Sequence, residues 1–260
     1  MENDVFLYKY ISFSRFVELI ELHRLYLTKI TLWEDPYEGF PVKKNFNEGI
    51  PTWVVEKMNK KLIEAGKNSV LQHTYAQSWT DTREESDAMW RIYSQDKLGV
   101  RITVKLAQIL QQITEAVTKI NSTIKVNHYK VKYHQGYNVD NCRTPDKMGI
   151  IMTDKAICEL KRPAFEHEAE YRISCSLKLA DTMRKNNSSM MSEIELADIF
   201  EKIQTPPVIH YDVPIDSICE VILDPRAPES HKKTFLEYCK NRGFDQHNVL
   251  FQKSNLYTLL

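Results

Sequence analysis

The sequence predicts an α+β fold in which helices pack on a mixed, mainly antiparallel sheet. Short apolar runs typical of strands and amphipathic segments typical of helices intermix along the 260-residue chain. They do not alternate regularly, and no glycine-rich turn joins a strand to a helix, which disfavours a doubly wound parallel sheet. The length suits a single core, so we expect one domain over residues 1–260 with a helical insertion at about 181–207.

In the first half of the chain, capping and turn residues mark the element boundaries. A strand at 5–11 is followed by Ser12 or Ser14 as the cap of a helix. A second strand at 25–32 is expected to stop at the turn-like segment 33–39, which contains a proline and a glycine. The elements predicted after it are a helix at 52–65, a strand at 74–80, a helix capped by Ser86, a strand at 100–104, an amphipathic helix at 106–120 and a strand at 125–134.

Proline and glycine also delimit the elements of the second half. Pro163 ends a helix predicted at about 153–162, and an acidic strand at 168–175 follows. Ser192 and Glu195 have capping-box spacing within the expected insertion. The last predicted elements are a strand at 218–223, a helix at about 230–241 and a strand at 248–253.

The acidic strand carries the strongest functional signal. If residues 168–175 are extended, Glu168, Glu170 and Arg172 lie on one side and an apolar set lies on the other. Two carboxylates and a guanidinium on one face suit electrostatic work on a polar ligand, because neighbouring charges shift each other's pKa values. The alternative is a charged strand that faces water, with ion pairs worth about 0 to 1 kcal/mol each.

Composition and charge restrict the classes of partner. Lys+Arg and Asp+Glu are balanced at 35 each, so no overall charge attracts nucleic acid, although the basic, aromatic strand at 125–134 is a local candidate. The five cysteines are widely spread and lack a CxxC pair, which argues against disulfides and structural zinc and favours the cytoplasm. The N-terminus is acidic and no apolar run has the length of a membrane span, so we expect no membrane partner.

Several common catalytic motifs do not occur. The sequence has no P-loop, dinucleotide-binding GxGxxG, HExxH or nucleophile elbow. The eight histidines do not pair at metal-ligand spacing. A magnesium-dependent nuclease is a minor alternative, in which distant carboxylates gather around the ion near Lys161. The carboxylates concerned are Asp35, Glu38, Glu168 and Glu170.

A series of short segments resembles one prokaryotic family. The segments are Leu7–Tyr10, Leu25–Thr28, Asp35–Glu38, Gln77–Thr80, Met89–Tyr93, Gly99–Ile102, Lys161 and Glu168–Arg172. In this order they resemble the family named domain of unknown function 2971, leaving 40–70 and 176–207 outside the resemblance. The chain departs from the family pattern before Asp35, where an Asn is usual, and at Gln77 to Trp79, where Cys-Phe-Ser is usual.

The order of elements is also similar to that of the ADP-ribosyltransferase superfamily. That resemblance implies an ADP-ribosyltransferase-like fold, NAD as cofactor, and a macromolecular acceptor such as protein or nucleic acid. The matching positions are Tyr8 to Tyr10 on the first strand, Ser78-Trp79-Thr80, and Glu168-Ala169-Glu170. The usual first-strand arginine or histidine is missing at Tyr8 and Tyr10, with Lys9 as an imperfect substitute. Toxin or antiviral settings are implied by the resemblance only.

The same resemblance implies a role for each candidate residue. Cleavage of the nicotinamide glycosidic bond builds positive charge on the ribose, which a fixed Glu170 or Glu168 carboxylate stabilises. Other residues are expected to bind the cofactor. Ser78 or Thr80 would orient the ribose or carboxamide, Trp90 or Tyr93 would stack on the nicotinamide, and Lys9 or Arg172 would hold a phosphate, beside Tyr8 and Tyr10.

Each of these residues also has a structural explanation. Trp90 and Tyr93 at helical spacing are typical of core positions, and Asp35 and Glu38 are typical of a turn. An alternative function is therefore a non-catalytic module that binds a nucleotide or a protein through a polar pocket.

Overall fold

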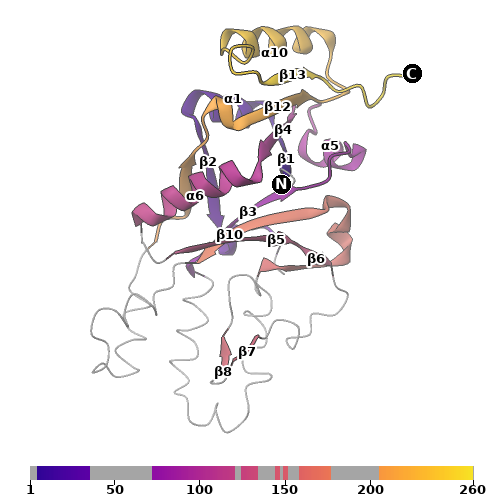
Figure 1. The fold of residues 1–260 in the computed structure, drawn as a ribbon. Helices are drawn as coiled ribbons and strands as arrows, with labels where there is room; N and C mark the ends of the chain where they lie inside the picture. The colour runs from indigo at the N-terminus through magenta and orange to yellow at the C-terminus, as the bar shows by residue number, and fades with distance from the viewer. Residues whose placement is uncertain are drawn as a thin grey trace.

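The computed structural model describes residues 5–35, 72–120, 124–133, 144–146, 149–151, 158–176 and 205–259 (Figure 1). Its strands are β1 (Phe6–Ile11), β2 (Arg24–Lys29), β3 (Thr74–Thr80), β4 (Val100–Lys105), β5 (Lys125–Lys130), β6 (Lys132–Tyr133), β7 (Thr144–Asp146), β8 (Gly149–Ile151), β9 (Leu160–Lys161), β10 (Glu170–Ser176), β11 (Val208–Asp212), β12 (Ile218–Leu223) and β13 (Leu250–Lys253). Its helices are α1 (Phe13–Leu22), α5 (Asp87–Tyr93), α6 (Leu106–Ile120) and α10 (Glu229–Asn241), with short 3-10 turns η1 (Ile30–Leu32), η3 (Pro163–Glu168) and η5 (Ile215–Ser217).

In the described part of the chain, nine strands form one sheet. Its main path is β11-β2-β3-β1-β4-β12-β13, and β10 and then β5 add to the other edge of β3. All of its pairings are antiparallel except that of β12 with β13. The predicted mixed, mainly antiparallel sheet with packed helices is therefore confirmed.

The sheet splits at β3. One edge of β3 pairs with β10 along its whole length, from Thr74 to Thr80. The opposite edge is shared, because Thr80 pairs with β1 while Tyr75 and Ala76 pair with β2. Residues 77–79 lie between these two contacts, so β1 and β2 diverge there and leave a gap.

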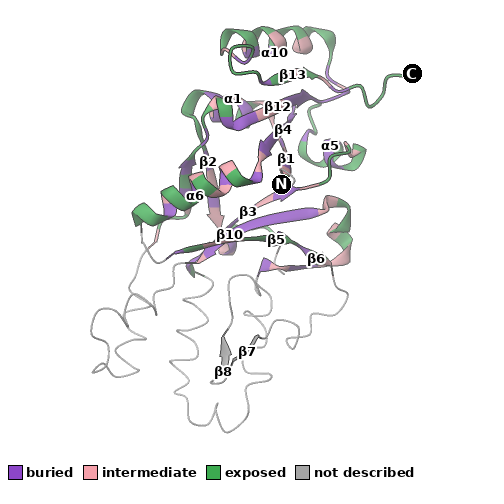
Figure 2. Cartoon of the chain, in the orientation of Figure 1, coloured by how far each residue is buried: buried purple, intermediate pink, exposed green. Residues whose placement is uncertain are grey.

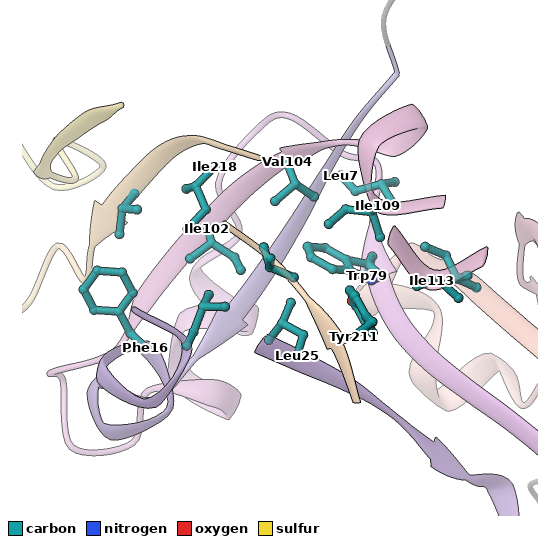
Figure 3. Close-up of a cluster of buried hydrophobic side chains, with 14 of the residues drawn as sticks. Leu7, Phe16, Leu25, Trp79, Ile102, Val104, Ile109, Ile113, Tyr211 and Ile218 are labelled. Atoms are coloured by element: carbon teal, nitrogen blue, oxygen red, sulfur yellow. The ribbon is translucent and has the colours of Figure 1, made fainter. Parts of the chain in front are cut away.

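One face of the sheet carries the main core. Helix α6 crosses this face and buries Ile109, Ile113 and Val117 against it (Figure 1). The apolar stripe predicted from the spacing of these residues explains why the helix lies there. Figure 3 shows the strand side chains that it meets, including Leu7, Trp79, Ile102 and Val104, with Phe16 of α1 beside them.

The opposite face carries a row of polar residues. Tyr8, Thr80 and Glu170 are cross-strand partners on β1, β3 and β10, so their side chains share this face. Helix α5 contacts β1 and η3, and Met89 and Trp90 form a second small core with Tyr10. As a result β10, whose charged side was predicted to face either a polar ligand or water, is buried along nearly its whole length (Figure 2).

Most element boundaries in the described residues agree with the predictions, and the serine caps at Ser12 and Ser86 accept hydrogen bonds from Arg15 and Met89. Three predictions were wrong. The second strand ends at Lys29, and residues 30–32, predicted as its last part, form the 3-10 turn η1. The segment at 160–161, assigned to a helix, is strand β9 paired with β6, and the acidic strand begins at Glu170 because Ala169 is left-handed.

One strand of the nine-stranded sheet was not predicted, and some predicted elements lie outside the described residues. Strand β11 was not predicted. The helix at 52–65 and most of the insertion at 181–207 lie outside the described residues. Among the helices that are described, none combines the length and apolar character needed to cross a bilayer.

Replacement of Gly99 by alanine is expected to destabilise the fold. A Cβ at Gly99 would lie 2.8 Å from the carbonyl oxygen of Ile11 and from the Ser94 side chain. Overpacking of this kind costs about 1–3 kcal/mol. Urea unfolding followed by circular dichroism measures the loss, with Lys119→Ala on the exposed side of α6 as the control. Equal midpoints for Gly99→Ala and the parent protein would contradict the expected clash.

Candidate functional site

The polar row forms the floor of a small cavity. The cavity has a volume of about 60 Å³ and lies between the sheet, α5 and η3. Its lining residues are Tyr8, Lys9, Tyr10, Ser78, Trp79, Thr80, Met89, Tyr93, Glu168 and Glu170. Most of the residues proposed from the sequence to be catalytic or to bind a cofactor are thus brought together, although they come from four separate parts of the chain.

Glu170 is held on both oxygens. Its Oε1 accepts hydrogen bonds from the Ser78 hydroxyl and from Arg172 Nε, the latter at 2.7 Å. Its Oε2 accepts from Arg172 Nη2 at 2.9 Å and from Lys161 Nζ at 3.0 Å. The side chain is 1% exposed. Four donors fill the acceptor sites of a carboxylate and fix its orientation.

These contacts keep the Glu170 carboxylate charged. Burial by itself raises the pKa of Glu170, but the charge and hydrogen bonds of Arg172, together with Lys161 and Ser78, outweigh burial and lower it from 4.5 to about 2. Burial likewise lowers the pKa of Lys161, and the two glutamates more than offset that effect, so its pKa lies above the usual value. Both groups are ionised at neutral pH.

Glu168 reaches the same lysine from η3. Lys161 Nζ donates to Glu168 Oε2 at 2.7 Å. This convergence depends on Ala169, whose φ of 42° turns the chain between the two glutamates. The strand pattern had predicted that Glu168 and Glu170 share one strand face. They do not, but Glu168 lines the same cavity from η3.

Arg172 is enclosed by the protein and bonded to other protein groups. It is fully buried, donates from Nη1 to the Cys158 carbonyl at 2.7 Å, and lies 4.7 Å from the centre of the Trp33 ring. Its guanidinium thus orients Glu170 and has no exposed surface for a phosphate. The phosphate role predicted for Arg172 is not compatible with this burial.

A larger groove adjoins the cavity at the split of the sheet. It has a volume of about 280 Å³, and both spaces are lined by Lys9, Ser78 and Tyr93. The other residues of the groove come from the end of β1, from α1, β2 and β3, and from the position after η1. They are Ile11, Arg15, Glu18, Leu19, Arg24, Leu25, Tyr26, Thr28, Trp33, Ala76 and Gln77. We call this space the β1–β2 groove.

Lys9 stands between the two spaces. Its Nζ donates to the carbonyl oxygen of Ser78 at 2.6 Å, in the gap between β1 and β2 along one edge of β3, and lies 5.4 Å from the Trp79 ring. The residue keeps some exposed surface, but its ammonium end is enclosed. Burial lowers the pKa of Lys9 to about 8, an effect that the Glu170 charge only partly offsets.

Tyr93 contributes a hydroxyl beside Glu168. The residue as a whole is 40% exposed, yet desolvation of its hydroxyl, with the neighbouring Glu168 charge, raises the Tyr93 pKa to about 12. The phenol is therefore protonated at neutral pH and has a hydrogen to donate.

Other candidate residues have contacts that favour a supporting role. The Thr80 hydroxyl donates to the Ala169 carbonyl at 3.0 Å, and the Tyr10 hydroxyl accepts from the Ser86 amide at 3.2 Å. Trp90 is fully buried, packs edge-on against Tyr10 at 4.8 Å and does not line the cavity, so the core explanation holds for it. The Arg101 guanidinium lies over the Tyr8 ring, 4.9 Å from the centre of that ring.

The three carboxylates of the nuclease alternative that the structure describes do not gather around a metal position. Asp35 pairs with Arg162 at 2.9 Å, whereas Glu168 and Glu170 face Lys161. Within the described ranges, no group of three or more His, Cys, Asp or Glu residues is arranged to hold a metal ion. Glu38 lies outside those ranges.

Sequence reasoning missed several residues of the groove. Arg15 and Arg24 line it from α1 and from the start of β2, and Tyr26 and Trp33 add aromatic rings. Tyr133 was assigned only to a strand, but its hydroxyl accepts the backbone N–H of Glu170 at 2.8 Å. No local sequence signal marks these residues, because only the split of the sheet brings them together.

Residues 89–173 match the model of a family described as a protein of unknown function (DUF2971). The matched segment includes most of α5, Lys161 and both glutamates of the cavity, but not Lys9, Ser78 or most of the groove. Comparison with curated proteins and with solved structures finds no match. The family resemblance seen in the sequence is thus supported over this segment, and the similarity to ADP-ribosyltransferases stays a prediction.

Replacement of Glu170 by glutamine is expected to destabilise the protein by about 3–5 kcal/mol at pH 7, because Arg172 would be left without a buried counter-charge and Lys161 would keep only Glu168. The folded-state pKa of Glu170 lies below its unfolded value, so its contribution is present above about pH 4.5 and is lost as the pH falls toward 2. The loss amounts to about 3 kcal/mol.

Urea unfolding at several pH values between 6 and 3 tests both effects. Glu159→Gln is the matched control, since Glu159 also pairs with a lysine, Lys132, at 2.7 Å but outside the cavity. The parent protein and Glu159→Gln should lose stability in acid more steeply than Glu170→Gln. Parallel pH curves for all three proteins would show that Glu170 is not held as described.

Proposed function

We propose that the protein cleaves the nicotinamide glycosidic bond of NAD and transfers the ADP-ribose to a macromolecule or to water. The observation that carries the proposal is the cavity in which two carboxylates, two hydroxyl-bearing strand residues and Tyr93 converge beside a groove rich in cations. The cavity and the groove together suit a ligand with a cationic ring at one end and phosphates at the other.

The chemistry begins with heterolysis of the bond between ribose C1′ and the nicotinamide nitrogen. The bonding electrons leave with nicotinamide, which becomes neutral, and positive charge develops on the ribose. The Glu170 carboxylate is fixed and ionised, so it stabilises that charge without reorganisation. Ser78 orients this carboxylate through its hydroxyl.

The second step requires a base for the incoming nucleophile. A water molecule or an acceptor group attacks C1′ and loses a proton. Glu168 is suited to receive it, because Glu168 lines the cavity from η3 and its hydrogen bond from Lys161 is on one oxygen, Oε2. Tyr93 is placed to contact the ligand, since it lines both the cavity and the groove.

A non-catalytic binding module is the second candidate. It is favoured by the charge balance around Glu170, where Arg172 and Lys161 offset Glu168 and Glu170. A neutralised, fully hydrogen-bonded carboxylate has less charge to offer a reacting ribose than an unpaired one. In this case the same cavity and groove would recognise a nucleotide or a protein without changing it.

Nicotinamide release from NAD, followed by chromatography, distinguishes the two functions. The parent protein is expected to release nicotinamide in water or with protein and nucleic-acid acceptors. Glu168→Gln and Glu170→Gln should each lower the rate by roughly 100-fold or more, because each removes a group that acts in the transition state. Glu159→Gln serves as the control, and Ser78→Ala tests the site without removing a buried charge.

The rates of the variants can be compared only when each variant is folded like the parent protein. Each variant is assayed below its unfolding temperature, with circular dichroism as the check. Absence of nicotinamide release by the parent protein with every acceptor would reject the catalytic proposal in favour of binding. Release that survives in Glu168→Gln, Glu170→Gln and Ser78→Ala alike would place the chemistry elsewhere.

A further inference from the structure

The charge of the β1–β2 groove is positive. Lys9, Arg15 and Arg24 line it, against one carboxylate, Glu18. Arg15 pairs with Glu18 at 2.5 Å, so the net excess comes from Lys9 and Arg24. Arg24 is exposed at the start of β2, while the Lys9 ammonium lies at the inner end, where the groove meets the carboxylate cavity.

The backbone of β3 adds directional groups at that inner end. The Ser78 carbonyl points into the gap between β1 and β2, since Lys9 reaches it there. In an antiparallel strand the N–H and C=O of one residue point to the same edge. The Ser78 N–H therefore also faces the gap, as a donor next to the Lys9 ammonium. An ammonium beside a backbone N–H is a combination that binds phosphate oxygens.

Aromatic rings also line the groove. Tyr26 and Trp33 line it, and each has an arginine against its ring, Arg15 at 5.6 Å and Arg172 at 4.7 Å. Tyr93 lies where the groove meets the cavity and is 40% exposed. Rings held in this way offer flat surfaces on which a nucleobase stacks.

We propose that the β1–β2 groove is a nucleoside diphosphate site, with Lys9 and Arg24 on the phosphates and an aromatic ring of the groove against the base. This inference rests on the proposed function in one respect, because the ADP half of NAD would lie here while its nicotinamide riboside half enters the carboxylate cavity. It also stands for a binding module, since neither Lys9 nor Arg24 is needed for bond cleavage.

Calorimetric titration of ADP into the full chain at low ionic strength tests the groove. The parent protein is expected to bind ADP, and Arg24→Gln and Lys9→Gln should each weaken binding by roughly 10-fold. Arg91→Gln is the matched control, because Arg91 is an exposed arginine with its own ion pair on α5, outside the groove. Raising the salt concentration should weaken binding of ADP but not of adenosine.

The results separate this inference from the proposed function. Failure of the parent protein to bind ADP, or equal binding by Arg24→Gln and the parent, overturns the groove assignment. Nicotinamide release from NAD that ADP does not inhibit overturns it as well, while leaving the proposed function intact. ADP binding that depends on Arg24, without any nicotinamide release, supports the groove and rejects the catalytic proposal.

Discussion

The contact between Glu170 and Arg172 is the interaction on which the site depends. Two residues on one face of β10 form a two-point ion pair, with Nε to Oε1 and Nη2 to Oε2, at full burial. Burial of a single charge is costly, so neither side chain is tolerated there without the other. Once the pair is in place, Lys161, Glu168 and Ser78 take positions that follow from its geometry.

This arrangement explains why the polar face of the sheet is enclosed. The two negative charges of Glu168 and Glu170 balance the two positive charges of Lys161 and Arg172. Helix α5 and η3 can therefore cover them without an excess of one sign. The cover creates the small cavity, and the divergence of β1 from β2 supplies its outlet toward Arg24. The inner space is therefore lined by carboxylates whose charge is balanced, whereas the groove has a net positive charge from Lys9 and Arg24.

Much of the fold was predictable because its signals are local. Ser12 and Ser86 are helix caps, the spacing of Ile109, Ile113 and Val117 defines α6, and β3 and β12 have the predicted bounds. The burial of the charged side of the acidic strand was not predictable, because it depends in part on α5, which is far from Arg172 in sequence. Likewise the groove exists only because two strands share one edge of β3, which alternation within each strand cannot reveal.

The left-handed conformation of Ala169 restricts how this chain can vary. At a φ of 42°, a β-branched side chain would clash with its own backbone, whereas glycine, asparagine or aspartate would be accommodated. The link between the two glutamates is therefore limited to a narrow set of residue types. Related chains that keep the shared lysine contact should be recognisable by a small or αL-tolerant residue between two acidic ones.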